Sequence, residues 1–130
     1  KLITRLVDKI EKNIDSMSYY EEYNMDDAET VIIAFGGVSR SAKSAIDEMR
    51  NEGKKVGLFR PVTMWPILEK QIKKAADKAK EIYVAEMNLG QYYFEVERIA
   101  GKKCPVKKIS KVTGELITPS EIISAVKGGK

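Results

Sequence analysis

Short apolar runs alternate with amphipathic helical patterns along this chain, and this alternation limits the possible folds more than any other feature. The predicted strands are residues 30–35, 56–59, 82–85 and 106–109, and the predicted helices are residues 2–17, 41–52, 67–79, 91–100 and a last one after Thr118. Strands that are apolar throughout and alternate with helices are typical of a parallel sheet covered on both faces. The pattern therefore predicts an α/β fold, in which ligand-facing side chains gather beyond the carboxyl ends of the strands.

Two further segments have residue types that predict a loop and the start of a helix. Residues 18–27 lack a helical period and collect turn-forming residues, which predicts a connecting loop. Tyr19, Tyr20 and Tyr23 in that loop either cover a domain surface or subunit contact, which we favour, or stack on a ligand. Thr118-Pro-Ser-Glu121 has the spacing of a capping box with proline at the first helical position, and it marks the start of the last helix.

Length and composition predict one globular domain, residues 1–130, in which residues 1–28 form an N-terminal helix and its connecting loop. No apolar run approaches the roughly 18 residues of a membrane span, so we expect no membrane partner. Because the sequence begins Lys1-Leu-Ile-Thr, without an initiator methionine or a secretory leader, we expect a fragment of a larger cytoplasmic subunit. Many Lys and Glu residues with no His suit a thermophile.

The inventory of reactive side chains excludes several kinds of chemistry. The sequence has no histidine, which removes Ser-His, Cys-His and histidine-based zinc sites from this chain. Its one cysteine, Cys104, can form no internal disulfide and cannot alone hold an iron–sulfur cluster, and a reducing compartment is expected. Neighbouring lysines would lower the thiol pKa of a nucleophile or redox sensor. We favour an inert thiol.

Charge is balanced along the chain, with 23 basic and 19 acidic residues and a net charge of +4. One group of lysines follows helical spacing: Lys70, Lys73, Lys74, Lys78 and Lys80. The favoured interpretation is a solvated helix face, and the alternative is an electrostatic footprint for nucleic acid. We expect no nucleic-acid partner.

A glycine pair follows the first predicted strand and opens a candidate anion site, made of Gly36, Gly37, Ser39, Arg40 and Ser41. Backbone N–H groups and a helix N-terminus there would bind an anion, with the two serines and the arginine as further donors. The segment matches neither a dinucleotide-binding nor a Walker A pattern. An ordinary strand-to-helix turn with a serine cap is therefore favoured over a phosphate site.

The loop at residues 60–66 carries Arg60, Thr63 and Trp65 between two prolines that restrict its backbone. Arg60 either binds a carboxylate, a phosphate or an acidic partner, or it pairs with Glu86 while Trp65 packs under its own domain. A contact between subunits is a third interpretation of the same residues.

The loop at residues 86–91 begins with Glu86 at the end of an apolar strand and carries Asn88 and Gln91. Glu86 is the strongest candidate for a perturbed acid, but a general base would need desolvation and a bound substrate. The favoured interpretation is that Glu86 orders the two loops.

Four segments together resemble one known family. Residues 34–42, 56–66, 86–91 and 114–119 are similar to the C-terminal part of the α subunit of 2-oxoglutarate (2-oxoacid):ferredoxin oxidoreductases, and the likeness covers almost the whole chain. The resemblance implies a three-layer α/β/α sandwich like the transketolase C-terminal domain, with a mainly parallel sheet of about five strands. The sequence patterns above identify only four of these strands. Ile67-Leu68 departs from related chains, which often have Phe-Pro there.

The reaction that the family implies is oxidative decarboxylation of a 2-oxoacid to acyl-CoA with reduction of ferredoxin. The enzyme uses thiamine diphosphate, magnesium, coenzyme A and iron–sulfur clusters. This chain has no Gly-Asp-Gly motif and no set of cysteines, so the resemblance implies a non-catalytic domain that binds no metal and supports assembly. The expected partners are the remainder of the α subunit, the β subunit, further γ and δ subunits and, through the whole hetero-oligomer, ferredoxin.

The resemblance also implies that the domain borders the active-site entrance or a subunit interface through Arg60, Thr63, Trp65, Glu86, Asn88 and Gln91. We expect the tryptophan-bearing loop and the Gln91 turn to lie side by side on one rim. The alternatives are the equivalent domain of another thiamine enzyme, of the transketolase or pyruvate dehydrogenase β type, and a separate anion- or nucleic-acid-binding module.

Overall fold

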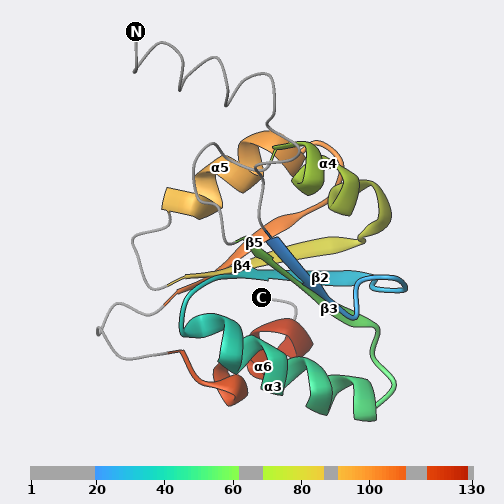
Figure 1. Cartoon of the computed structure of the whole chain (residues 1–130), viewed down its shortest axis with the longest axis vertical. Coiled ribbons are helices and arrows are strands. Elements are labelled where there is room, and N and C mark those ends of the chain that lie inside the picture. The colour runs from blue at the N-terminus through green and yellow to red at the C-terminus, as the bar shows by residue number, and fades with distance from the viewer. Residues whose placement is uncertain (1–19, 62–68, 87–90, 111–116, 129–130) are drawn as a thin grey trace, which may run out of the picture.

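One mixed sheet lies between two layers of helices in the computed structural model, which describes residues 20–61, 69–86, 91–110 and 117–128. The strands are β1 (Tyr20–Tyr23), β2 (Thr30–Ala34), β3 (Val56–Pro61), β4 (Glu81–Glu86) and β5 (Val106–Ser110), and the helices are α3 (Val38–Asn51), α4 (Glu69–Lys78), α5 (Gln91–Ala100) and α6 (Pro119–Gly128). The strand order is β1-β3-β2-β4-β5, and only β1 runs antiparallel to its neighbour. Helices α4 and α5 cover one face and α3 and α6 the other (Figure 1).

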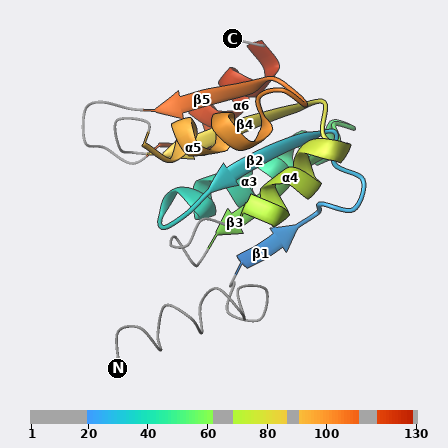
Figure 2. The same cartoon turned by 90° about the horizontal axis from the view of Figure 1, so that it is seen from above.

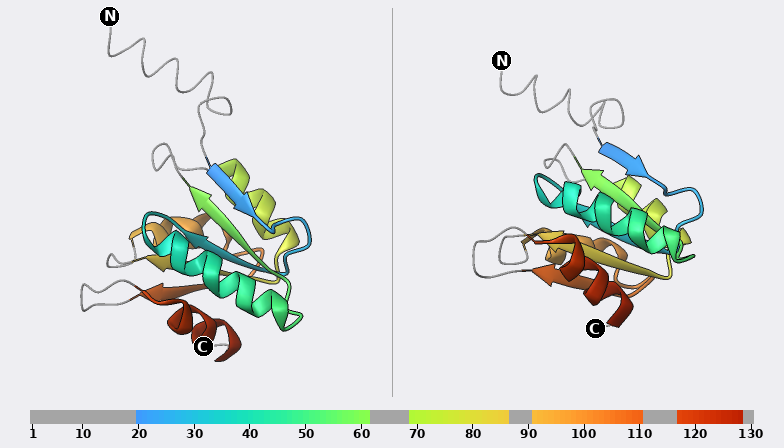
Figure 3. Two further views of the ribbon diagram at one scale, coloured as in Figure 1. Left: turned by 60° about the horizontal axis from the view of Figure 1, so that its bottom comes forward. Right: turned by 90° about the horizontal axis from the view of Figure 1, so that it is seen from below.

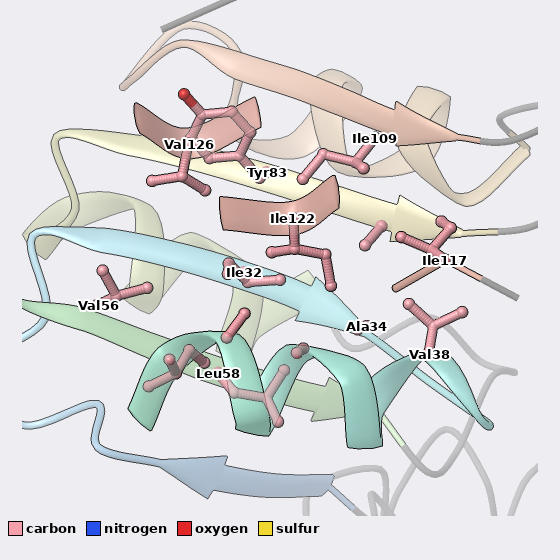
Figure 4. Close-up of a cluster of buried hydrophobic side chains, with 14 of the residues drawn as sticks. Ile32, Ala34, Val38, Val56, Leu58, Tyr83, Ile109, Ile117, Ile122 and Val126 are labelled. Carbon is pink, nitrogen blue, oxygen red and sulfur yellow. The ribbon is translucent and has the colours of Figure 1, made fainter. Parts of the chain in front are cut away.

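Side chains of the central strand β2 alternate between the two cores, as the period of a strand requires. Val31 and Ile33 join the buried cluster under α4 and α5. Ile32 and Ala34 join the cluster against α3 and α6, where Ile32 lies near Ile122 of α6 (Figure 4). Because both faces of this strand are buried, the continuous apolar run in the sequence is explained.

Most of the predicted elements are confirmed. The helix predicted at residues 91–100 has the bounds of α5, and the four predicted strands correspond to β2 through β5. The capping box also forms: the Glu121 N–H donates to Thr118 Oγ1 at 3.2 Å, and the Thr118 N–H donates to Glu121 Oε1 at 2.9 Å. The helix predicted at residues 2–17 lies outside the described residues.

The loop predicted at residues 18–27 is wrong for Tyr20–Tyr23, which form the fifth strand. β1 pairs antiparallel with β3, so that Glu21 lies opposite Arg60 and Tyr20 opposite Pro61. The Tyr20 ring packs on Phe59 with 5.3 Å between centroids, and the Tyr23 hydroxyl donates to Asp47 of α3. The residues of β1 lie at the exposed edge of the sheet, so the sequence has no apolar run there that would predict a strand, although tyrosine favours strands.

Gly57 of β3 permits a close approach of the segment that joins β1 to β2. A Cβ atom at this position would lie 2.7 Å from the backbone oxygen of Asn24 and 2.8 Å from the Ala28 Cβ. Both neighbours are too close for a side chain, and one is backbone. Glycine is therefore required here by space.

The carboxyl ends of the parallel strands meet at one edge of the sheet (Figures 2 and 3). The chain leaves β2 for α3 on one face, whereas it leaves β3 and β4 for α4 and α5 on the other. Such a change of face is where open α/β sheets bind ligands. In the part of the chain that the structure describes, no helix is long and apolar enough to cross a bilayer.

Candidate functional site

The turn from β2 into α3 differs from its predicted form. α3 begins at Val38, three residues earlier than expected, because Gly36 takes a positive φ of 63° and turns the chain at once. The helix N-cap is Gly37, which makes no side-chain cap, and the Ser39 hydroxyl donates to the Gly36 carbonyl at 2.6 Å. The predicted serine cap is therefore wrong.

Arg60 near the end of β3 pairs with β1. Its Nη1 lies 2.8 Å from Glu21 Oε1, and Lys43 Nζ lies 3.7 Å from the same oxygen. The hydrogen bond from Arg60, followed by the positive charge of Lys43, holds the pKa of the Glu21 carboxyl below its ordinary value. The interpretation in which Arg60 pairs with Glu86 is therefore wrong. It took no account of β1, which supplies the partner.

A hollow of about 350 Å³ opens between this ion-pair group and the glycine turn. Its walls are Gly36, Gly37, Ser39, Arg40, Lys43 and Arg60. Four of the five residues of the predicted anion site therefore lie together, whereas Ser41 is buried and does not line the hollow. Sequence reasoning missed Lys43, although it follows Arg40 by three residues on α3 and thus shares its helix face.

Glu86 holds the start of α5. Its side chain is 1% exposed, and the backbone N–H groups of Tyr92 and Tyr93 donate to its Oε2 and Oε1 at 3.2 and 3.0 Å. A carboxylate at a helix N-terminus satisfies donors that have no partner inside the helix and opposes the positive end of its dipole. Both oxygens are occupied by the fold, which supports an ordering role for Glu86 over that of a general base.

Tyr92 places its ring against Phe35, with 5.2 Å between centroids, and is 7% exposed. Burial, followed by the negative charge of Glu86, raises the pKa of its hydroxyl to about 12. Because the folded pKa lies above that of an unfolded tyrosine, this group stabilises the fold fully below about pH 10 and less as the pH rises toward 12.

We expect Tyr92→Phe to flatten the alkaline loss of stability. A hydroxyl pKa of about 12, against about 10 for a free tyrosine, corresponds to about 3 kcal/mol of unfolding free energy between about pH 9 and pH 12. Urea denaturation of both proteins across this range measures the difference. Tyr20→Phe, at a 40% exposed position, is the control. Parallel curves for Tyr92→Phe and the unchanged protein would contradict the expectation.

Several predicted site residues lie partly or wholly outside the part of the chain that the structure describes. Thr63, Trp65 and Asn88 lie outside the described residues, and Gln91 is described only as the first residue of α5. The strands that lead into the two loops, β3 and β4, end on the same edge with β2 between them. That the loops themselves lie side by side stays a prediction.

Cys104 and the lysine-rich helix follow their favoured interpretations. Cys104 is 6% exposed, and burial raises the pKa of its thiol. Lys73 of α4 pairs with Glu69 at 3.3 Å, and Lys80 pairs with Glu29 at 3.1 Å, as in a solvated charged face. Among the residues that the structure describes, no group of three His, Cys, Asp or Glu side chains is placed to hold a metal ion.

Three known proteins are similar to the chain, one in sequence and two in fold. The chain is 43% identical over 128 residues to 2-oxoglutarate synthase subunit KorA of Methanocaldococcus jannaschii, which covers 98% of this chain and 34% of that subunit. In fold it matches a 2-oxoglutarate:ferredoxin oxidoreductase from Magnetococcus marinus, solved with 2-oxoglutarate, coenzyme A and succinyl-CoA, with a TM-score of 0.79 and 22% identity over 98% of this chain and 22% of that one.

The third similar protein is an inactive β4 tetramer of a split-gene transketolase. It matches with a TM-score of 0.69 and 20% identity over 79% of this chain and 38% of that one. The three-layer fold implied by the resemblance is thus confirmed. The chain spans about a third of the length of its KorA relative. The family model described as pyruvate:ferredoxin oxidoreductase core domain II matches residues 28–122, and the chain belongs to that family.

Proposed function

We propose that this chain is an assembly and active-site-bordering domain of a 2-oxoglutarate:ferredoxin oxidoreductase α subunit. The observation that carries the proposal is the 43% identity to a 2-oxoglutarate synthase subunit along 98% of the chain. The whole enzyme would decarboxylate the 2-oxoacid, transfer the acyl group to coenzyme A and pass the electrons to ferredoxin. Its further subunits make the assembly a hetero-oligomer.

The chemistry of the donor set supports a non-catalytic role for this domain. Thiolate ligands for an iron–sulfur cluster need several cysteines, and the sequence has one, which is buried. Glu86, the most buried carboxylate at the strand ends, already accepts two backbone N–H groups. A single cysteine does not fit an iron–sulfur cluster, and a carboxylate that already accepts two backbone N–H groups does not fit a magnesium ion. We therefore assign the clusters, and the magnesium with its thiamine diphosphate, to other parts of the enzyme.

The geometry of the sheet edge supports a bordering role. Arg60 near the end of β3 is hydrogen-bonded to β1, and Glu86 at the end of β4 is hydrogen-bonded to α5. Both strands are therefore anchored at the ends from which the next loops leave. Anchored loops at the carboxyl edge of a parallel sheet are suited to contacts with a neighbouring domain or with substrate. We propose that Thr63, Trp65, Asn88 and Gln91 make those contacts.

Reconstitution tests the proposal. The chain, joined to the rest of its α subunit and combined with the β subunit, is expected to support reduction of ferredoxin that depends on 2-oxoglutarate and coenzyme A. Pyruvate and 2-oxoisovalerate, offered in place of 2-oxoglutarate, identify the substrate. Activity with NAD and lipoyl carriers instead would favour a pyruvate dehydrogenase type of enzyme and contradict the proposal.

A substitution in the proline-bounded loop separates a bordering role from a core role. Trp65→Ala is expected to lower holoenzyme activity or subunit association more than the stability of this chain. Thermal unfolding and size-exclusion chromatography of the variant measure the two effects. Phe94→Ala, on the outer face of α5 at a 59% exposed position, is the matched aromatic control. An equally large loss of chain stability in Trp65→Ala would assign Trp65 to the core.

A further inference from the structure

We propose that the hollow at the β2–α3 turn binds a phosphate-bearing small molecule. It is lined by basic side chains from two elements, Arg40 and Lys43 of α3 and Arg60 of β3. The sheet register brings Glu21 of β1 beside Arg60, although Glu21 does not itself line the hollow. The inference does not depend on the proposed function.

The charges around the hollow do not balance. Glu21 pairs with both Arg60 and Lys43, which leaves three positive charges against one negative charge. Within the described residues, Arg40 has no carboxylate within ion-pair distance and lies exposed. A net charge of about +2 matches a phosphate group, which carries nearly two negative charges near neutral pH, better than it matches a single carboxylate.

Hydrogen-bond donors point to the same class of ligand. Arg60 lines the hollow with a side chain that is 33% exposed, and Arg40 and Lys43 add further N–H donors around it. A guanidinium presents its donors as a planar fork, and a tetrahedral phosphate accepts from such a fork at two oxygens. Several N–H donors beside unbalanced positive charge favour an anion with several acceptor oxygens.

The backbone leaves room for that anion. At Gly36 a Cβ atom would meet no atom within 4 Å, so open space adjoins the main chain of the turn. The hollow of about 350 Å³ accommodates one or two phosphate groups and lies at the small end of ligand sites. Phosphate and diphosphate groups therefore fit, with Arg40 and Lys43 as the side chains that are most free to turn toward them.

Calorimetric titration of the full chain with inorganic pyrophosphate, and separately with inorganic phosphate, tests the proposal at low ionic strength. One saturable site is expected. Arg40→Gln and Lys43→Gln should each weaken its affinity about tenfold, the usual effect of one charge-assisted hydrogen bond. The control is Lys74→Gln, which removes an exposed charge from α4 on the other face of the sheet and should change the affinity less than about twofold.

Succinate separates phosphate recognition from general attraction of dianions, because it carries two charges on carboxylates. It is expected to bind at least about tenfold more weakly than pyrophosphate. Equal affinity for succinate, loss of binding in Lys74→Gln equal to that in Arg40→Gln, or no saturable binding to the unchanged chain would each overturn the proposal. Circular dichroism of each variant verifies that the fold is retained, and both test residues lie on the solvent side of α3.

Discussion

Ile32→Ala is expected to lower the free energy of unfolding by about 4 kcal/mol. Ile32 has no exposed surface and lies in β2, the central strand, with α3 and α6 packed over it (Figure 4). Removing three carbons from this position leaves a cavity that neighbouring strands on both sides prevent from collapsing. The loss would be a large share of the roughly 5–15 kcal/mol that stabilises a domain of this size.

Chemical denaturation of Ile32→Ala and of the unchanged protein measures that loss. An equal m-value for the two proteins shows that the difference in midpoint reports stability. Phe94→Ala is the control, because it removes a larger apolar side chain from a 59% exposed position of α5. Its effect should stay within about 0.5 kcal/mol. If both variants lost equal stability, the assignment of Ile32 to the centre of the core would be contradicted.

Glu86→Ala is expected to lower the free energy of unfolding by about 3 kcal/mol. The substitution removes both acceptors of the Tyr92 and Tyr93 N–H groups and leaves those donors at the buried start of α5. It also removes a negative charge from the positive end of the helix dipole. Glu86→Gln retains one acceptor oxygen but turns an amide NH₂ toward the other N–H, so its loss should be about half as large.

Denaturation of the two Glu86 variants beside Glu48→Ala, an exposed glutamate of α3, tests this expectation. The three proteins should rank Glu86→Ala, Glu86→Gln and Glu48→Ala in order of decreasing loss. A Glu86→Ala chain that kept its stability, while the holoenzyme lost its activity, would instead indicate that Glu86 acts on a ligand.

The alternation of strands and helices was predictable because each element carries its own period. β2 buries both of its faces and reads as a continuous apolar run, and α5 has one buried stripe, so neither depends on a partner to be recognised. The capping box at Thr118 is equally local. β1 was missed because its four residues are mostly exposed and its strand character comes from pairing with β3.

The candidate site was predicted in parts but not as a whole. The glycine turn and Arg60 were each identified, whereas their meeting in one hollow depends on sheet register. One of the interpretations of Arg60 paired it with the wrong carboxylate, because its partner, Glu21, lies on the strand that the sequence patterns did not identify. Local patterns thus identified the charged groups, and long-range pairing decided which of them meet.

The central position of β2 has a consequence for biosynthesis. Its two neighbours, β3 and β4, both follow it in the chain, so during translation it leaves the ribosome before either hydrogen-bonding partner exists. One side of β2 remains open until Glu86 has emerged. Pairings of such long sequence separation are slow to form, and the nascent chain therefore exposes the apolar strand β2 until its later partners have been synthesised.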